Sequence, residues 1–276
     1  MHLGSLLPFI KKYTGSTIVI KYGGSAMTDL DLCYSLIQDI ILLYYLNINI
    51  ILIHGGGPFI NQWLLKLNIQ PKFNNGIRIT DNQTLELVQM VLLGKVNSDL
   101  VSLFNRQDDL AIGLSGNDSN LIIPEPLFSS SNNFVATVKS INSRLLNLLL
   151  VNKYIPIIAS IASNDQGQMY NINADTIAGY IAAAMKADKL ILLTDTPGIM
   201  TNINDNSSLI KQITTKDLKK LKADKVIIGG MIPKVNACVT ALNNGVQSTH
   251  IINGTYKHSL LYELFSDFHV GSTITI

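Results

Sequence analysis

The sequence predicts an α/β protein with an open, mostly parallel sheet and helices on both faces, an αβα sandwich. Short runs of branched apolar residues alternate along the chain with longer segments that repeat apolar residues at helical spacing. Glycine-rich turns follow several of the short runs. Because strands that alternate with helices pair in parallel, these observations together indicate this fold class.

The first half of the chain is predicted to contain buried strands and the helices that connect them. Asp29 and either Thr80 or Asp81 are suited to cap the starts of two helices. We expect strands at 17–22, 48–54 and 111–116, helices at 3–13, 30–46, from the GGGP turn through Trp63 and Leu67, at 80–106 and at 142–152, and β structure at 121–141 around the Ser/Asn-rich turn 128–133.

The second half repeats the alternation. A helix built mainly of small residues and a helix that ends at Gly245 are its longest predicted elements. We expect strands at 154–162, 189–195 and, as the last one, 248–253, with helices at 173–187, 215–223 and 231–245. The organisation predicts two lobes, residues 1–160 and residues 161–276, although no Pro/Gly/Ser-rich linker separates them.

Composition argues against several classes of protein. Hydrophobic residues make up 47% of the 276 residues and charged residues 14%. The most apolar region, 36–57, is interrupted by Asp39 and two asparagines, so a buried parallel sheet explains it better than a membrane span. The net charge of +2 comes without a basic stripe, which argues against nucleic acid as a partner. Cys33 and Cys238 lie in helical patterns and are interpreted as packed, reduced thiols.

Three glycine-rich turns follow predicted strands or open a helix, namely KYGG, HGGGP and GGMIPK. Glycines let backbone N–H groups approach an anion, and a helix N-terminus adds partial positive charge. Ligands of open α/β sheets bind at the carboxyl ends of the strands, so three such turns suggest a phosphate site. A single one is more often a tight turn. The P-loop and GxGxxG patterns are absent from the sequence.

Two lysines and an aspartate lie beside these glycine turns and indicate that the predicted phosphate site could catalyse phosphoryl transfer. Lys21 ends a strand beside Gly23 and Gly24, and Lys234 follows the turn GG at 229–230, so both can point into one cleft. Phosphoryl transfer is catalysed mainly by positioning and by cations at the transferred group. Asp175, in the stretch YNINAD, would accept from both lysines and keep them charged. The alternatives are a surface lysine at 234 and a helix cap at 175.

At this point the residues resemble the amino acid kinase family over nearly the whole chain. The resemblance rests on ten blocks in the family's order, among them IVIKYGGSAM, LIHGGGPFIN, NGIRITD, MVLLGKVNSDLV, YNINADTIAG, LILLTDTPGIM and IGGMIPKVNAC. The combination of HGGGP, GIRITD and GGMIPK is close to diagnostic, whereas one of them alone is not. Within the family, the blocks are most similar to the members that phosphorylate N-acetyl-L-glutamate.

The resemblance implies roles for individual residues. The catalytic residues would be Lys21 and Lys234, which stabilise the transferred phosphoryl group, and Asp175, which organises them. The substrate-binding residues would be Gly56, Gly57, Asn171 and Arg78, the last as a clamp for the α-carboxylate. The nucleotide site would contain Lys21, Gly23, Gly24, Thr194, Asp195, Gly229, Gly230 and Met231.

The implied reaction is the transfer of the γ-phosphoryl group of ATP to the γ-carboxylate of N-acetyl-L-glutamate, with ADP as the second product. The N-terminal lobe would bind acetylglutamate and form the dimer, and the C-terminal lobe would bind ATP. No protein-held metal is expected, since Mg²⁺ would arrive with the nucleotide. His54 is assigned to packing at a strand end. Two alternatives stay open: another kinase of the family, acting on acetylaminoadipate, carbamate, aspartate or a nucleoside monophosphate, and a non-catalytic arginine sensor.

The chain ends carry the expectations about regulation. Helix 3–13 and the segment 257–274 resemble the parts of arginine-inhibited members that link dimers into a hexamer and bind arginine. We therefore expect L-arginine as an allosteric inhibitor and a homo-oligomer, either a dimer or a trimer of dimers. A similarity to enzymes of the photosynthetic lineage, an Arg-poor composition and an N-terminus unlike a signal or import peptide together suggest a plastid-encoded stromal protein. The resemblance then implies PII signalling protein as a candidate partner, and the cytoplasm of a bacterium is the alternative location.

Overall fold

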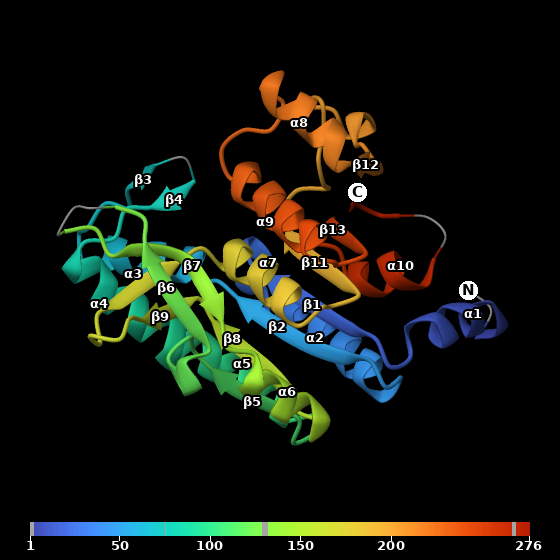
Figure 1. The fold of residues 1–276 in the computed structure, drawn as a ribbon, viewed down its shortest axis with the longest axis horizontal. Helices are drawn as coiled ribbons and strands as arrows, with labels where there is room; N and C mark the ends of the chain where they lie inside the picture. The colour runs from blue at the N-terminus through green and yellow to red at the C-terminus, as the bar shows by residue number, and fades with distance from the viewer. Residues whose placement is uncertain (1–2, 75, 129–131, 267–268) are drawn as a thin grey trace.

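A computed structural model describes residues 3–74, 76–128, 132–266 and 269–276, and an eight-stranded sheet forms its centre (Figure 1). The strand order is β12-β14-β13-β11-β1-β2-β8-β5. The bounds are β1 Thr17–Tyr22, β2 Asn49–His54, β5 Ala111–Leu114, β8 Ile155–Ala159, β11 Lys189–Thr194, β12 Gln212–Thr214, β13 Ser248–Asn253 and β14 Ser272–Thr275. The described pairs of this sheet are parallel except β13–β14.

Helices cover both faces of this sheet. Successive residues of β1 point to opposite faces, so Ile18 and Ile20 join one apolar cluster with α2, whereas Val19 joins the other with α7 and α9. The helices are α1 Leu3–Tyr13, α2 Leu30–Tyr45, α3 Gly57–Lys66, α4 Asn82–Gln89, α5 Ser98–Asn105, α6 Arg144–Val151, α7 Ala174–Ala184, α8 Thr215–Ala223, α9 Met231–Asn243 and α10 Ser259–Phe265, with short helices at Ser25–Met27, Asp118–Asn120 and Asn206–Ser208.

Two smaller sheets stand beside the carboxyl end of β2, on the left of Figure 1. One has the strand order β6-β7-β10-β9, and the other is the two-stranded hairpin β3-β4. Their bounds are β3 Phe73–Asn74, β4 Ile77–Arg78, β6 Ile122–Pro126, β7 Val135–Ile141, β9 Ile161–Ser163 and β10 Met169–Ile172. These sheets carry Arg78 and Asn171, and therefore bring two of the predicted substrate-binding residues toward the edge of the central sheet.

The fold class predicted from the sequence is confirmed, and three predicted elements need correction. The strand predicted at 154–162 is two strands, β8 in the central sheet and β9 in the four-stranded sheet. The strand 248–253 is not the last one, because β14 follows it and pairs antiparallel with it. The helix predicted at 80–106 is continuous but not uniform, since a π-helical segment η2, Met90–Asn97, separates α4 from α5. All three features depend on long-range packing rather than on local periodicity. The middle of the predicted turn at 128–133 lies outside the described residues.

Within the described residues, one helix, Asn82–Asn105, is long and apolar enough to cross a membrane by length and composition. In the fold, one face of this helix packs into the core through residues such as Leu85, Val88 and Leu92. A core helix has the same composition as a spanning one, so the packing accounts for its apolar character.

Candidate active site

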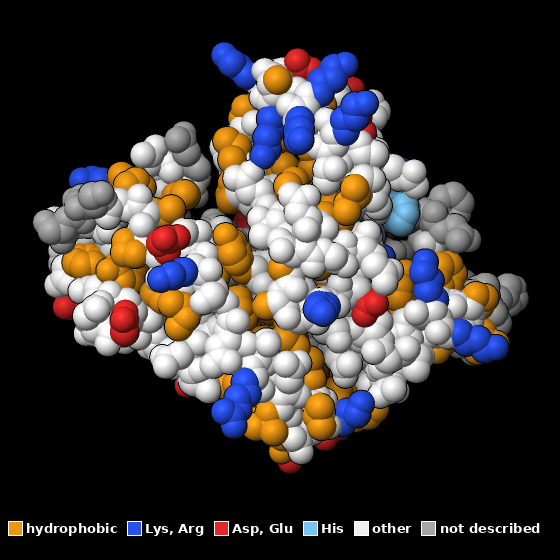
Figure 2. Space-filling view, viewed as in Figure 1, with side chains coloured by type: hydrophobic (Ala, Val, Ile, Leu, Met, Phe, Trp, Pro, Cys, Tyr) orange, Lys and Arg blue, Asp and Glu red, His pale blue; other side chains and the backbone are white. Residues whose placement is uncertain are grey.

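A cleft of about 440 Å³ lies where β1 and β2 end, and Figure 2 shows the surface hollowed between the β3-β4 side and the α8-α9 side. The predicted catalytic and nucleotide-binding residues that line it are Lys21, Gly23, Gly24, Asp175, Asp195 and Lys234. The predicted substrate-binding residues Gly56, Gly57, Arg78 and Asn171 line it too. Residues from both halves of the chain therefore meet at one cleft.

Asp175 is the centre of the polar cluster in this cleft. Its Oδ1 lies 3.0 Å from the Nζ of Lys21, and its Oδ2 accepts a hydrogen bond of 2.8 Å from the Nζ of Lys234. Burial would raise the pKa of Asp175, but the two ammonium groups outweigh it and hold the pKa below its usual value. Burial lowers the pKa of Lys21, and Asp175 opposes that shift. The cluster carries one positive charge in excess, which suits a phosphate.

The two ends of this cluster are fixed by the close packing of α7 on α9. Asn173, not Asp175, caps α7, because its Oδ1 accepts from the N–H groups of Asp175 and Thr176. The alternative of a helix cap at 175 is therefore wrong, because Asp175 lies in the first helical turn. At Gly179 a Cβ would come 2.7 Å from the carbonyl oxygen of Ala237 in α9. The glycine lets the helices approach, so that Asp175 reaches Lys234.

Arg78 forms the other end of the cleft. Its Nη2 donates to Asn61 Oδ1 at 2.5 Å, and its Nη1 is buried without a hydrogen-bond partner in the described part of the chain. Burial lowers the pKa of Arg78 to about 10, so it stays charged at neutral pH. A buried, charged donor without a partner is costly, and an anionic ligand would satisfy it.

Two residues that hold this end together were not found by sequence reasoning. Asn61 orients Arg78, and Thr80 accepts a hydrogen bond of 3.1 Å from the Nδ2 of Asn171. Both lie inside blocks that carried the family resemblance. Their residue types alone give no signal, because asparagine and threonine are common in turns and helix caps.

The predicted nucleotide-binding residues separate into two groups. Lys21, Gly23, Gly24 and Asp195 line the cleft, whereas Thr194, Gly229, Gly230 and Met231 do not. Thr194 is buried beside the cleft and donates to Asp195. The turn at Gly229 and Gly230 lies against Gly76, where a Cβ would be 3.3 Å from the oxygen of Gly229. The tip of the β3-β4 hairpin therefore touches the C-terminal half across the cleft.

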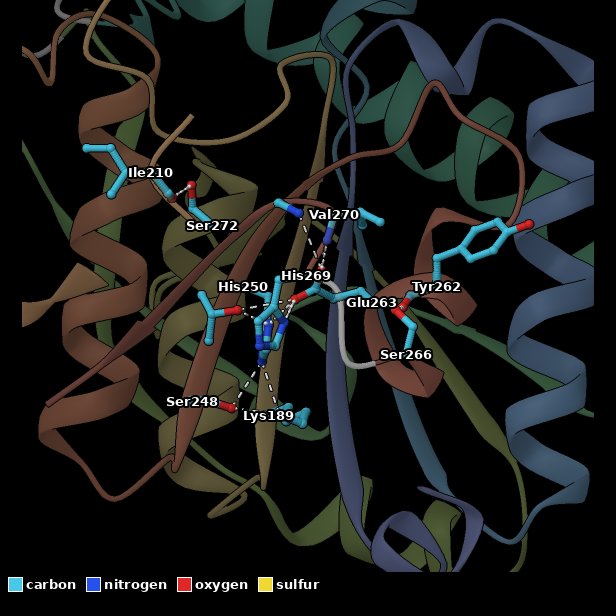
Figure 3. A network of polar contacts seen from close by, with 12 residues as sticks. Lys189, Ile210, Ser248, His250, Tyr262, Glu263, Ser266, His269, Val270 and Ser272 are labelled. Atoms are coloured by element: carbon cyan, nitrogen blue, oxygen red, sulfur yellow. Dashed lines mark hydrogen bonds and ion pairs between the residues drawn. The ribbon is translucent and has the colours of Figure 1, made fainter. Parts of the chain in front are cut away.

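A second polar cluster lies away from the cleft, around Glu263 of α10 (Figure 3). Its Oε1 is 2.7 Å from His250 Nδ1 and 2.9 Å from His269 Nδ1, and its Oε2 accepts from the N–H of Val270. Burial would raise the pKa of Glu263, but these hydrogen bonds and His250 lower it to about 2.

The three side chains His250, Glu263 and His269 have a spacing that could hold a metal ion, and they are the group of that kind found among the described residues. The carboxylate is already occupied by several donors, and the Nζ of Lys189 lies 3.1 Å from His250 Nε2. His250 and His269 both donate to Glu263 through Nδ1, so the nitrogens that face the carboxylate carry protons and are not free to bind a metal. The geometry therefore fits a hydrogen-bonded network better than a metal centre.

Comparisons with known proteins identify the family of this chain. The model of the Amino acid kinase family matches residues 16–253. The chain is 52% identical over 275 residues to an acetylglutamate kinase of Gracilaria tenuistipitata var. liui, covering 99% of this chain and 96% of that protein. It is 50% identical over 274 residues to the chloroplastic acetylglutamate kinase of Arabidopsis thaliana, covering 99% and 79%.

Among solved structures, an N-acetylglutamate synthase of Neisseria gonorrhoeae has the same fold, with a TM-score of 0.88 at 23% identity over 100% of this chain and 63% of that one. This likeness supports the fold alone. The family model covers the strands and helices that carry both lysines and Asp175. With relatives about half identical over nearly its whole length, the chain belongs to the amino acid kinase family and is a kinase.

Proposed function

We propose that this kinase transfers the γ-phosphoryl group of ATP to the γ-carboxylate of N-acetyl-L-glutamate, giving N-acetyl-L-glutamyl 5-phosphate and ADP in arginine biosynthesis. The observation that carries the proposal is the pair of ammonium groups, Lys21 and Lys234, held by one carboxylate in a cleft that also contains Arg78. The names of the relatives from Gracilaria and Arabidopsis support the acceptor.

The chemistry needs no general base. A γ-carboxylate is ionised at neutral pH, and its oxygen attacks the γ-phosphorus directly. A bond from oxygen to phosphorus forms, the bond from phosphorus to the β,γ-bridging oxygen breaks, and the electron pair leaves with ADP. Charge on the transferred group is stabilised by Lys21 and Lys234, which Asp175 keeps charged and in place. This agrees with a cleft without a catalytic histidine among its lining residues.

Acceptor recognition is assigned to the Arg78 end of the cleft. The unpartnered Nη1 of Arg78 would donate to the α-carboxylate of the acceptor, while Asn61 keeps the guanidinium in place. Gly56, Gly57 and Asn171 line the same end. The aromatic ring of Phe73 lies 4.7 Å from the guanidinium carbon of Arg78 and shields it from water.

The nucleotide is assigned to the end formed by Gly23, Gly24 and Asp195, which line the cleft. The assignment of Thr194, Gly229, Gly230 and Met231 to the nucleotide site belongs to this proposal. A divalent Mg²⁺ bound to the nucleotide supplies charge neutralisation of the β- and γ-phosphates. Among the cleft-lining residues, Asp175 is engaged by two lysines and Asp195 is exposed, so the donor set suits a metal that arrives with ATP. The division into an acceptor lobe, 1–160, and an ATP lobe, 161–276, belongs to this proposal.

Release of ADP from purified protein and MgATP tests the proposal, with a panel of acceptors that separates the alternatives. N-acetyl-L-glutamate should support turnover, and hydroxylamine should trap an acyl phosphate. N-acetyl-L-aminoadipate, carbamate, aspartate and a nucleoside monophosphate should support far less. Turnover with another acceptor would reassign the substrate, and no turnover with any acceptor would favour a non-catalytic arginine sensor.

The matched variants are Lys234→Ala and Lys139→Ala. Lys139 is exposed on β7, away from the residues that line the cleft. Lys234→Ala should remove turnover while calorimetry still detects binding of acetylglutamate, because Arg78 and the glycine turn are intact. Lys139→Ala should behave like the wild type. Full turnover by Lys234→Ala would contradict the role given to the lysine pair.

We also propose that L-arginine inhibits this enzyme at the Glu263 cluster. Tyr13 at the end of α1 packs edge-on against Phe265 of α10, with 6.2 Å between ring centroids. The Nζ of Lys189 lies 5.5 Å from the Tyr13 ring and contacts His250 (Figure 3). A buried carboxylate held mainly by neutral donors suits a guanidinium, and α1 lies where a ligand could change its position. Residues 267–268 of the predicted arginine segment lie outside the described part.

The proposed assembly is a trimer of dimers in which α1 links the dimers. Arginine should inhibit the wild type, and Glu263→Gln should weaken that inhibition, whereas Glu125→Gln, at an exposed glutamate of β6, should not. Light scattering should give a hexamer for the wild type and a dimer for a variant that lacks residues 1–12. A wild-type dimer, indifferent to arginine, would contradict this part of the proposal.

The proposed location is the plastid stroma, with the cytoplasm of a bacterium as the alternative. The relatives include a chloroplastic enzyme of Arabidopsis and an enzyme of the alga Gracilaria, as well as cyanobacterial ones, which supports either place. PII signalling protein is a proposed partner in both. Co-purification of the two proteins at low and high arginine would test this interaction.

A further inference from the structure

His54 ends β2 directly before the glycine turn Gly55–Gly57, and its side chain is fully buried. Its Nδ1 lies 2.9 Å from the carbonyl oxygen of Gly55. Because a carbonyl oxygen can only accept, Nδ1 carries the proton and Nε2 is an acceptor. Burial lowers the pKa of His54 to about 4, so the imidazole is neutral at neutral pH.

Asn97 supplies the donor that this acceptor needs. Its Nδ2 lies 2.9 Å from His54 Nε2 and 2.9 Å from the carbonyl oxygen of Ile157 in β8, so each N–H of the amide has its own acceptor. The sheet makes room for this side chain, since a Cβ at Gly113 of β5 would lie 2.2 Å from Asn97 Oδ1. The amide therefore ties the glycine turn to two further strands.

The π-helical segment η2 is what brings Asn97 to this place. It interrupts a helix that is otherwise α-helical from Asn82 to Asn105, and such segments occur frequently at functional sites. The same segment packs on the glycine turn, because a Cβ at Gly56 would lie 2.6 Å from Leu92 Cδ2 and 3.5 Å from Val96 Cγ2. The turn is thus held by side-chain packing and by a hydrogen-bond chain from one segment.

We propose that Asn97 is a positioning residue for the acceptor substrate, acting through His54 on the glycine turn. The peptide between Gly55 and Gly56 is planar, so the N–H of Gly56 points opposite to the carbonyl that His54 holds. That carbonyl faces a buried imidazole, and the glycine turn lines the cleft. Fixing the imidazole fixes the direction of a backbone donor at the acceptor end. The inference rests on the proposed function in assigning the acceptor to this turn.

The test compares Asn97→Leu with Asn105→Leu. Asn105 lies on the same long helix and also joins it to β5, through its Nδ2 and the carbonyl oxygen of Ala111 at 3.1 Å. Its side chain bonds to Ala111, whereas that of Asn97 bonds to His54. Asn97→Leu should raise the KM for acetylglutamate about tenfold and leave the KM for ATP within about twofold, because misplacement of a substrate-positioning group weakens one substrate only. Asn105→Leu should change neither constant. Equal changes in both KM values for Asn97→Leu, or no change in either, would overturn the proposal.

A second measurement is made on the wild type, and it does not depend on turnover or on the folding of Asn97→Leu. Nitrogen-15 NMR of the wild-type imidazoles, with the His54 signal identified by its loss in His54→Gln, should show the Nδ1-protonated tautomer at neutral pH. The Nε2-protonated tautomer would overturn the inference. A wild type that binds acetylglutamate without phosphorylating it would defeat the proposed function instead, and the NMR result would still decide this inference.

Discussion

Among the buried carboxylates of the described residues, Asp175 and Glu263 are each 3% exposed, and their partners differ. Asp175 lies between two lysines at the edge of the cleft. Glu263 lies among two histidines and backbone N–H groups in the network of Figure 3. Asp175 thus stabilises two cationic side chains at the cleft. Glu263, in contrast, is an anion that its hydrogen-bond donors stabilise.

The difference explains why similar burial leads to different proposed uses. Burial disfavours the charged form of Lys21, and Asp175 favours it. The carboxylate therefore keeps the lysine charged, so that it can bind a phosphate. Around Glu263, burial lowers the pKa of His250 and favours its neutral form, so the negative charge is not cancelled there. The first arrangement suits an anionic ligand and the second a cationic one.

The largest expected effect comes from Asp175→Asn. We expect kcat to fall by about 100- to 1000-fold, because the ammonium groups of Lys21 and Lys234 would lose their shared carboxylate. The pKa of Lys21 would drop further without the carboxylate, so its charge would be lost at lower pH than in the wild type. Residual activity should therefore decline with rising pH where wild-type activity is steady. If Asp175→Asn keeps activity within tenfold of wild type and an unchanged pH profile, Asp175 is not needed to keep the lysines charged, and the proposed difference from the Glu263 cluster is wrong.

The convergence of Lys21, Lys234 and Asp175 could be predicted from the sequence because each residue lies at the end of a strand or in the first turn of a helix, at the carboxyl edge of a parallel sheet. The alternation of apolar runs and helical patterns was enough to place most strands within a few residues. These features are local in sequence or follow from general topology, so a single sequence carries them.

The remaining features are set by tertiary contacts. The π-helical segment, the approach of Gly179 to Ala237 and the orientation of Arg78 by Asn61 depend on which side chains meet across elements. A helix and a helix with a π segment have nearly the same apolar pattern, so periodicity cannot separate them. The short strand β14 is also visible only through its partners, β12 and β13.

The next largest expected effect is the contribution of the Glu263 carboxylate to the stability of the protein. A pKa lowered from 4.5 to about 2 corresponds to about 3 kcal/mol of stability. Because the folded-state pKa is depressed, this stabilisation is present above the unfolded pKa of 4.5 and is lost as pH falls toward 2. Urea unfolding should show Glu263→Gln about 3 kcal/mol less stable at pH 7. The difference in the free energy of unfolding between the wild type and Glu263→Gln should become smaller below pH 4. A difference that does not change with pH would contradict the depressed pKa assigned to Glu263.

A smaller effect tests how the Asp175 cluster is held. Gly179→Ala would force α7 away from α9, so we expect a loss of about 1–3 kcal/mol in stability together with a lower kcat. Gly94→Ala places the same methyl group in a helix with open space around it, and should leave stability equal or higher. Thermal unfolding and kcat measured on both variants would check this. Equal behaviour of the two variants would mean that the helix approach does not position Asp175.

The smallest expected effect concerns an exposed ion pair that, like the Asp175 cluster, joins a lysine to an aspartate. Lys95 Nζ lies 2.5 Å from Asp99 Oδ2, and both side chains are 52% exposed. Lys95→Ala should change the free energy of unfolding by no more than about 0.5 kcal/mol, because solvent screens the pair. A loss as large as that of Glu263→Gln would show that burial is not what distinguishes the carboxylate clusters.

The most direct measurement is a double-mutant cycle on the two lysines, with ADP release from MgATP and N-acetyl-L-glutamate as the readout. Two ammonium groups that act on one phosphoryl group through one carboxylate form a unit, so their effects should not add. We predict that Lys21→Ala with Lys234→Ala loses about as much activity as the worse single variant. Losses that multiply across the two sites would mean that the lysines act independently, and would contradict the account of the cleft.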